Sequence, residues 1–144
     1  MAASYDHDFY SWAMEQAALL RSGRLAQVDI DHIAEEIETL GRSEAAALRS
    51  SYRVLLGHLL KWRYQSQRRS ESRRQTIARE RINIDEHLDD SPGLKSRCAE
   101  LFEKAYGLAR REAAAETGMP LNVFPKECPF PMDEAVSDDF WPEP

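Results

Sequence analysis

The chain has 144 residues, of which 42% are hydrophobic and 31% are charged, and its formal net charge is −6. This length suits one domain of a soluble globular protein, and no apolar run approaches the roughly 20 residues that span a bilayer. The start, MAASYDHDFYSW, is not laid out as a secretion signal, and Cys98 and Cys128 form no CxxC pair, so we expect a cytoplasmic protein without a disulfide or zinc framework.

Helical periodicity dominates the first half of the chain, and no stretch shows the alternation of a strand. A first helix is predicted over about residues 8–22, ended by Gly23, and a second over about residues 31–40, ended by Gly41. A third is predicted over about residues 43–67. Its apolar stripe is the widest, so we expect it to be the most buried element.

Two more helices are predicted in the second half. One covers about residues 71–89. The other starts at Ser91, a capping residue followed by proline in the first turn, and stops at Gly118.

From residue 119 the composition changes. This segment holds six of the seven prolines and the aromatic residues Phe124, Phe130, Phe140 and Trp141. Prolines stop a helix from forming, and disordered segments are poor in aromatic residues. We therefore predict a single all-α domain over residues 1–144: a five-helix bundle (1–118) with an extended proline-rich C-terminal arm (119–144) that packs on the bundle. A mobile arm that docks on a partner is the alternative.

Several segments of the chain are distinctive: YDHDFYSWAMEQAALLRSGRLAQVDIDHIAEEIETLGRSE, HLLKWRYQ, TIARERINI, ETGMPL and FPKECPF. They resemble a bacterial family named domain-of-unknown-function family twenty-nine, over about residues 5–142. The resemblance implies a compact all-helical protein, and it implies no activity, cofactor or catalytic residue. Where family members usually have Ser-Trp after the basic cluster, this chain has Ser72 followed by Arg73.

Positive charge is concentrated in residues 61–81, which hold eight basic and two acidic residues in a chain of net charge −6. Such asymmetry predicts a polyanion site or two parts of the protein that neutralise each other. At about 100° per residue, Arg73 and Arg81 share the inner face of their helix with Ile77 and Ile84. Because an unpaired buried charge is costly, we expect Arg81 to contact a glutamate of the second or fifth helix.

Each predicted helix also directs a polar side chain inward. The candidate inter-helix polar cluster comprises Gln16, Glu36, His58, Arg73, Arg81, Glu112 and Glu116. The basic residues left over form a candidate basic patch, which comprises Lys61, Arg63, Arg68, Arg69, Arg74 and Arg79. Trp62 and Tyr64 interleave with this patch, as in proteins that stack single-stranded nucleic acid. No nucleic-acid-binding motif accompanies them, so we expect only weak association with nucleic acid.

Metal and catalytic chemistry have little support in the sequence. His32 precedes Glu35 and Glu36 at helical spacing, but this face is the solvated one and no second motif completes a metal site. No nucleophile elbow, phosphate loop or Cys–His pair is present. We expect no metal and no cofactor. For the inter-helix polar cluster, we expect a structural ion-pair network in preference to a carboxylate–arginine catalytic site.

Three functions stay open, in order of preference. The first is a non-catalytic cytoplasmic module that binds another protein. The second is a nucleic-acid-binding protein that uses residues 61–79. The third is an enzyme with a carboxylate–arginine site between helices. The sequence names neither a partner nor an oligomeric state.

Overall fold

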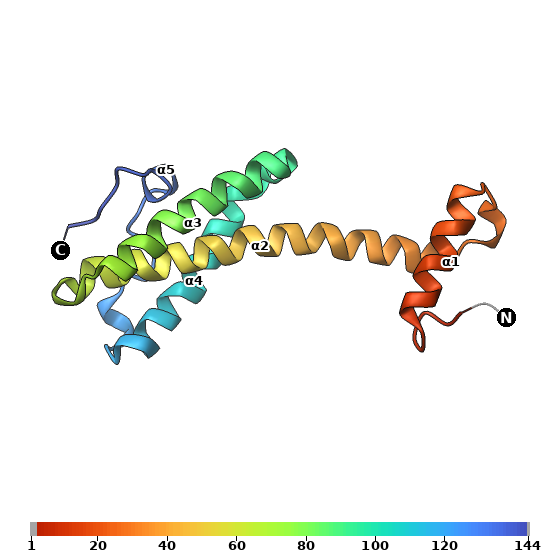
Figure 1. The fold of residues 1–144 in the computed structure, drawn as a ribbon. Coiled ribbons are helices and arrows are strands. Elements are labelled where there is room, and N and C mark those ends of the chain that lie inside the picture. Colours follow the sequence, from red (N-terminus) through yellow and green to blue (C-terminus); the bar gives the residue numbers. More distant parts are fainter. Residues whose placement is uncertain (1–2, 144) are drawn as a thin grey trace. The chain divides into compact units, whose positions relative to one another are not determined.

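The computed structural model describes residues 3–143, and in this part of the chain all regular structure is helical (Figure 1). Short 3₁₀ helices and loops join the five α-helices: α1 (Phe9–Arg21), α2 (Ile30–Tyr64), α3 (Glu71–Asp90), α4 (Cys98–Thr117) and α5 (Met132–Ala135). The prediction of an all-helical chain is confirmed. The described part of the chain has five α-helices, the predicted number, but α2 covers two of the predicted helices and α5 lies in the predicted arm. None of the described helices combines the length and the apolar character needed to cross a bilayer.

Internal packing divides the chain into two compact units: Met1–Ser43, the N-terminal unit, and Glu44–Pro144, the C-terminal unit. The helix α2 contributes its first part to the N-terminal unit and the remainder to the C-terminal unit. The predicted single domain, with a bundle over residues 1–118 and an arm over residues 119–144, stays a prediction.

In the N-terminal unit, α1 begins where the sequence predicts. The side chain of Asp8 caps it by accepting a hydrogen bond of 3.1 Å from the backbone N–H of Ser11. The helix ends before Gly23, whose φ of 75° lies in the left-handed region that glycine favours. The side chains of Trp12 and Gln16 are buried on its inner face.

The predicted helix end at Gly41 is wrong, because α2 continues through it. Among the described residues, Gly23 and Gly118 have a positive φ and Gly41 does not. The hydroxyl of Ser43, where the third helix was predicted to start, donates to the carbonyl of Thr39 one turn earlier. One glycine costs a helix only about 1 kcal/mol, which its long helix-forming flanks offset.

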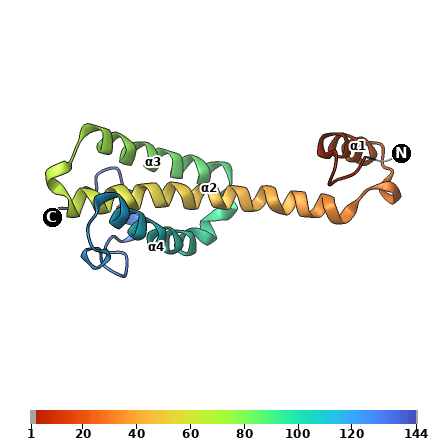
Figure 2. The ribbon, with the colours of Figure 1, turned by 90° about the horizontal axis from the view of Figure 1, so that it is seen from below.

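The core of the C-terminal unit is built on the later part of α2. Figure 2 shows α3 and α4 on either side of it. The side chains of α2 that face this core are almost fully buried: Leu48, Tyr52, Leu55, Leu56, Leu59 and Leu60. Side chains of the two flanking helices pack against them, among them Ile77, Ile84, Phe102 and Ala105. The wide apolar stripe thus belongs to the later part of α2, which is the most buried stretch of helix, as predicted.

The start of α3 and the end of α4 are set by residues that typically cap helices, whereas the start of α4 is not. Ser70 caps α3 by accepting a hydrogen bond from the N–H of Arg73, and Gly118 ends α4 with a φ of 72°. The predicted start of the last long helix at Ser91 is wrong. Residues Pro92–Arg97 form a 3₁₀ helix first, and the Ser91 hydroxyl donates to Glu44 instead of capping.

Residues 119–143 complete this core. They contain a 3₁₀ helix, Leu121–Val123, and the single turn of α5, so the segment is not uniformly extended. The side chains of Phe124 and Phe130 are 0% and 2% exposed and belong to the core of the C-terminal unit. The prediction that these aromatic residues pack on the helices is confirmed.

Candidate functional site

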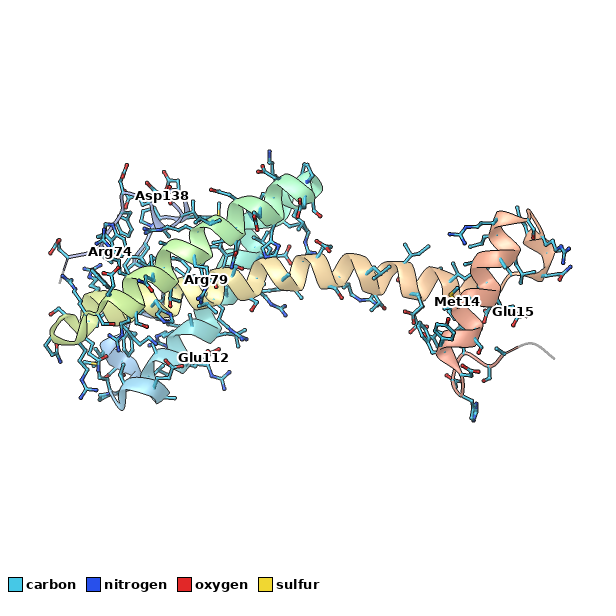
Figure 3. The ribbon with its side chains drawn as sticks, in the orientation of Figure 1. Met14, Glu15, Arg74, Arg79, Glu112 and Asp138 are labelled. Atoms are coloured by element: carbon cyan, nitrogen blue, oxygen red, sulfur yellow. The ribbon has the colours of Figure 1, made fainter. Side chains whose placement is uncertain are left out.

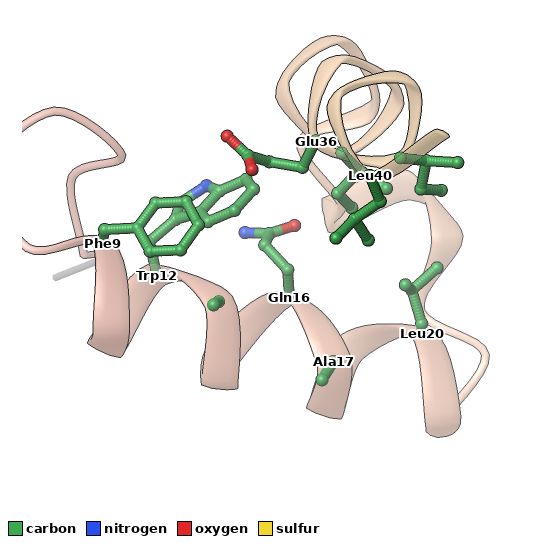
Figure 4. A pocket seen from close by; sticks show the side chains of 10 residues that line it. Phe9, Trp12, Gln16, Ala17, Leu20, Glu36 and Leu40 are labelled. Carbon is green, nitrogen blue, oxygen red and sulfur yellow. The ribbon is translucent and has the colours of Figure 1, made fainter. Parts of the chain in front are cut away.

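An apolar groove opens between α1 and the first part of α2, within the N-terminal unit (Figure 4). Its volume is about 570 Å³. The side chains that line it come from one face of each helix, at spacings of three and four residues: Phe9, Trp12, Ala13, Gln16, Ala17 and Leu20 from α1, and Ile33, Glu36, Ile37 and Leu40 from α2. All but Gln16 and Glu36 are hydrophobic. We refer to this feature as the apolar groove.

The N-terminal unit exposes most of the large hydrophobic side chains of the protein. Of the eleven that are exposed among residues 3–143, eight lie in this unit: Phe9, Tyr10, Met14, Leu20, Leu25, Ile30, Ile37 and Leu40. Four of these line the groove, and Leu40 is 68% exposed. Single exposed hydrophobic residues are normal on a surface, but several of them along one groove are uncommon on a monomeric protein.

A polar network centred on Asp29 fixes the residues at one end of the groove. The indole N–H of Trp12 donates to Asp29 Oδ2 at 3.1 Å, and the backbone N–H of Asp29 donates to Gln16 Oε1 at 2.7 Å. His32 Nδ1 lies 2.7 Å from the same Asp29 oxygen. This hydrogen bond raises the pKa of His32 and lowers that of Asp29. The network fixes the orientation of Trp12 and Gln16.

Tyr5 joins this network to Glu36. Its ring stacks on that of His32 with centroids 4.0 Å apart, and its hydroxyl donates to Glu36 Oε1. The hydrogen bond to Glu36 is the main reason that the pKa of Tyr5 rises to about 12. Gln16 and Glu36, two residues of the predicted polar cluster, therefore lie in the apolar groove of the N-terminal unit.

Three other predicted cluster residues, His58, Glu112 and Glu116, line a smaller cavity of about 100 Å³ in the C-terminal unit. The two glutamates each have a cationic partner. Lys61 Nζ lies 2.6 Å from Glu116 Oε2, and Arg53 Nε lies 3.1 Å from Glu112 Oε1. The hydrogen bond from Lys61 lowers the pKa of Glu116, whereas burial lowers the pKa of His58.

Lys61 is only 9% exposed, so its predicted place in an exposed patch is wrong. The pairing of Arg53 with Glu112 was not predicted. The signal was the four-residue repeat of Arg53, Gly57 and Lys61 along one face of α2.

Arg81 is buried as predicted, with 1% of its surface exposed, but its predicted contact with a glutamate is wrong. Its guanidinium donates three hydrogen bonds to backbone carbonyls of the last segment: Nε to Ala135 at 3.0 Å, Nη1 to Asp138 at 3.4 Å and Nη2 to Phe140 at 2.6 Å. Burial lowers its pKa. The spacing of residues along a helix predicts that Arg81 points inward. It does not predict which part of the chain, distant in the sequence, supplies the carbonyls that accept its hydrogen bonds.

Two further arginines of the basic segment hold the same part of the chain. Arg69 Nη2 donates to the carbonyl of Pro142 at 3.2 Å. The guanidiniums of Arg74 and Arg81 lie 4.7 and 5.1 Å from the ring centre of Trp141. Arg74 and Asp138 line the same hollow beside α3 (Figure 3). We call Arg69, Arg74 and Arg81 the arginine clasp.

The remaining basic residues are dispersed. Arg63 lies over the ring of Tyr64, Arg73 donates to Gln65 Oε1 at 2.9 Å, and Arg79 lies 3.7 Å from Glu80. Arg68 is exposed. The structure therefore places the six residues of the predicted patch in different surroundings, and part of their charge faces the C-terminal segment.

No group of three or more His, Cys, Asp or Glu side chains among residues 3–143 is arranged to hold a metal ion. Cys98 is buried, Cys128 is partly buried, and both are free thiols.

Curated proteins and solved structures give no match. A protein-family model matches residues 4–141, close to the span of the resemblance in the sequence. The chain therefore belongs to the family described as "Domain of unknown function DUF29".

Proposed function

We propose that the protein is a non-catalytic interaction module of the bacterial cytosol, and that it binds an amphipathic helix of another protein in the apolar groove. The supporting observation is the groove, with exposed Leu20, Ile37 and Leu40 along its sides. An apolar helix face laid into such a groove is a common mode of peptide recognition.

The size and shape of the groove favour a helix as the occupant. Its lining positions run from Phe9 to Leu20 on α1 and from Ile33 to Leu40 on α2, which are about three and two turns of helix. In Figure 4, α1 lies across the view and α2 is seen almost along its axis, so the two helices cross steeply. A third helix laid over this crossing would bury hydrophobic residues of both, at about 25 cal/mol for each Å² of apolar surface removed from water.

The two other functions have less support. Lys61, Arg69 and Arg81 are engaged within the C-terminal unit, which weakens the case for a nucleic-acid site at residues 61–79. The cavity beside His58 and Glu116 is about 100 Å³, too small for most substrates.

A site-specific photocrosslinking experiment tests the proposal. The crosslinker replaces Leu40 in the groove or, as a control, Ile82 of α3, which is 58% exposed in the C-terminal unit. Both proteins are irradiated in native cytosol, with and without nuclease. We expect a discrete, nuclease-resistant adduct to a different protein from position 40, lost when Leu20→Glu is added and kept when Leu108→Glu is added. Equal adducts from positions 40 and 82, or adducts only to the chain itself, would contradict the proposal.

A further inference from the structure

The apolar groove carries one acidic side chain, and this chemistry constrains what can occupy it. Glu36 lies among Ile33, Ile37 and Leu40 on the groove side of α2. Its Oε1 accepts a hydrogen bond from Tyr5, and no donor to Oε2 is found among residues 3–143. Glu36 is partly exposed, so water can reach its carboxylate in the open groove.

An occupant that covers the groove removes that water. A carboxylate left unpaired on burial costs several kcal/mol, whereas a cation placed beside it offsets the cost. Gln16, the other polar side chain of the lining, cannot neutralise Glu36. No Lys or Arg within the described range lines the groove, so an occupant that supplies a cation is favoured.

The charge of the whole unit points the same way. Residues 1–43 hold eight acidic and three basic residues, a net charge of −5. Of the three basic residues, Arg42 already lies 3.6 Å from Glu38. A second copy of this unit would bring another net −5 to the groove, so charge complementarity disfavours self-association through this surface and favours a basic partner.

We propose that the natural occupant of the groove is a basic amphipathic helix whose apolar stripe is interrupted near its middle by one Lys or Arg that pairs with Glu36. This inference rests on the proposed function and specifies its partner. The expected pattern has hydrophobic residues three and four positions before and after the central cation, so that they contact Leu20, Ile37 and Leu40.

Designed peptides test this inference on the full-length chain. The probe is a labelled Ala- and Leu-based peptide of about 18 residues, long enough to form a helix, with Lys at the centre of its Leu stripe. A matched peptide has Glu at this position. Binding is measured by fluorescence anisotropy in about 0.15 M salt. We expect the Lys peptide to bind the wild-type chain at least about tenfold more tightly than the Glu peptide, since an unlike charge pair replaces a like one.

Charge reversal in the protein provides the control. Glu36→Lys should reverse the preference, so that the Glu peptide becomes the tighter ligand. Glu38→Lys changes the net charge equally, at an exposed carboxylate outside the groove lining. This variant should keep the wild-type preference. Circular dichroism shows whether both variants fold, and Glu36→Gln, which keeps an acceptor for Tyr5, replaces Glu36→Lys if the latter does not fold. In Glu36→Gln the preference for Lys should largely disappear.

The outcomes separate this inference from the proposed function. Equal binding of both peptides to the wild-type chain, abolished by Leu20→Glu, would overturn the central cation and leave the groove as a helix-binding site. Equal effects of Glu36→Lys and Glu38→Lys would show that only overall charge matters and would also overturn it. No peptide binding, together with a position-40 adduct to another protein, would reject the basic helix alone. No peptide binding and no such adduct would reject both proposals.

Discussion

Arg81 joins two parts of the C-terminal unit that are distant in the sequence. It belongs to α3, and its three hydrogen bonds reach carbonyls between residues 135 and 140. A guanidinium with five donors in a fixed plane suits this role, because it can satisfy several carbonyls that no helix or strand pairs.

Arg81→Ala should destabilise the C-terminal unit by about 3 kcal/mol, because it leaves three carbonyls without this donor and removes the cation above Trp141. Arg79→Ala, two residues earlier at an exposed position, is the control and should change stability by no more than about 0.5 kcal/mol. Urea unfolding followed by circular dichroism measures both variants. Equal midpoints for the two would show that the clasp at Arg81 does not stabilise the fold.

His32 should titrate above its ordinary pKa of 6.5, because Asp29 accepts a hydrogen bond from its ring. The raised pKa means that protonated His32 stabilises the folded N-terminal unit below about pH 6.5, and that this contribution is lost as the pH rises through the folded-state pKa. His32→Gln should therefore cost more stability at about pH 5.5 than at about pH 8.5.

An NMR titration of the imidazole protons checks this directly. In Asp29→Asn the pKa of His32 should fall toward its ordinary value, while His58, whose pKa is lowered by burial, should be unaffected. A His32 pKa at or below 6.5 in the wild-type chain would contradict the prediction.

For individual residues, the sequence predicts which side chains face inward better than it predicts their hydrogen-bond and ion-pair partners. The inward direction of Gln16 and Arg81 follows from helical spacing alone. Their partners are the backbone N–H of Asp29 and the carbonyls of the last segment, which no periodic pattern encodes. Lys61 was misplaced for the same reason, since its partner Glu116 lies 55 positions away.

Among the elements, α2 is where sequence and structure differ most. Glycine after an apolar stripe ordinarily signals a helix end, and Gly23 and Gly118 behave in this way. Gly41 also follows an apolar stripe but keeps a helical backbone. The residues around it are exposed, so the helix-forming residues on both sides, and not packing, carry α2 through this position. An apolar stripe followed by glycine therefore does not by itself decide whether a helix ends.

Gly41→Ala should stabilise the protein by about 0.5–1 kcal/mol, because alanine favours a helix and a Cβ at this position meets no atom within 4 Å. The same substitution at Gly118, where φ is 72°, should destabilise by roughly 1 kcal/mol. Thermal unfolding of the two variants measures these opposite signs. Destabilisation by Gly41→Ala would indicate that a bend at this position matters to the native state.

At the scale of the whole molecule, the C-terminal segment is part of the structure and also neutralises part of the basic segment. Phe124 and Phe130 fill the core, and the acidic residues Asp138 and Asp139 lie in the stretch that Arg81 and its neighbours hold. The charge asymmetry of the sequence therefore corresponds, at least for the clasp residues, to two parts of one unit that neutralise each other.

Ending the chain at Gly118 should lower the melting temperature by several degrees, because it uncovers the surfaces that Phe124 and Phe130 bury and leaves Arg81 without its acceptors. A chain ended at Pro142 keeps every clasp contact and is the control. Differential scanning calorimetry measures both. A melting temperature unchanged after the longer deletion would show that residues 119–144 contribute nothing to stability.

The positions of the clasp residues in the sequence also determine the order in which the contacts of the two units can form during synthesis. Chains fold from the N-terminus as they are synthesised. The contacts of Tyr5, Trp12 and Glu36 are all made within the first 43 residues and become available early. Arg81 is synthesised more than fifty residues before Phe140, its last acceptor. During this interval the charge of Arg81 stays solvated, so the contacts of the N-terminal unit can form before those of the clasp.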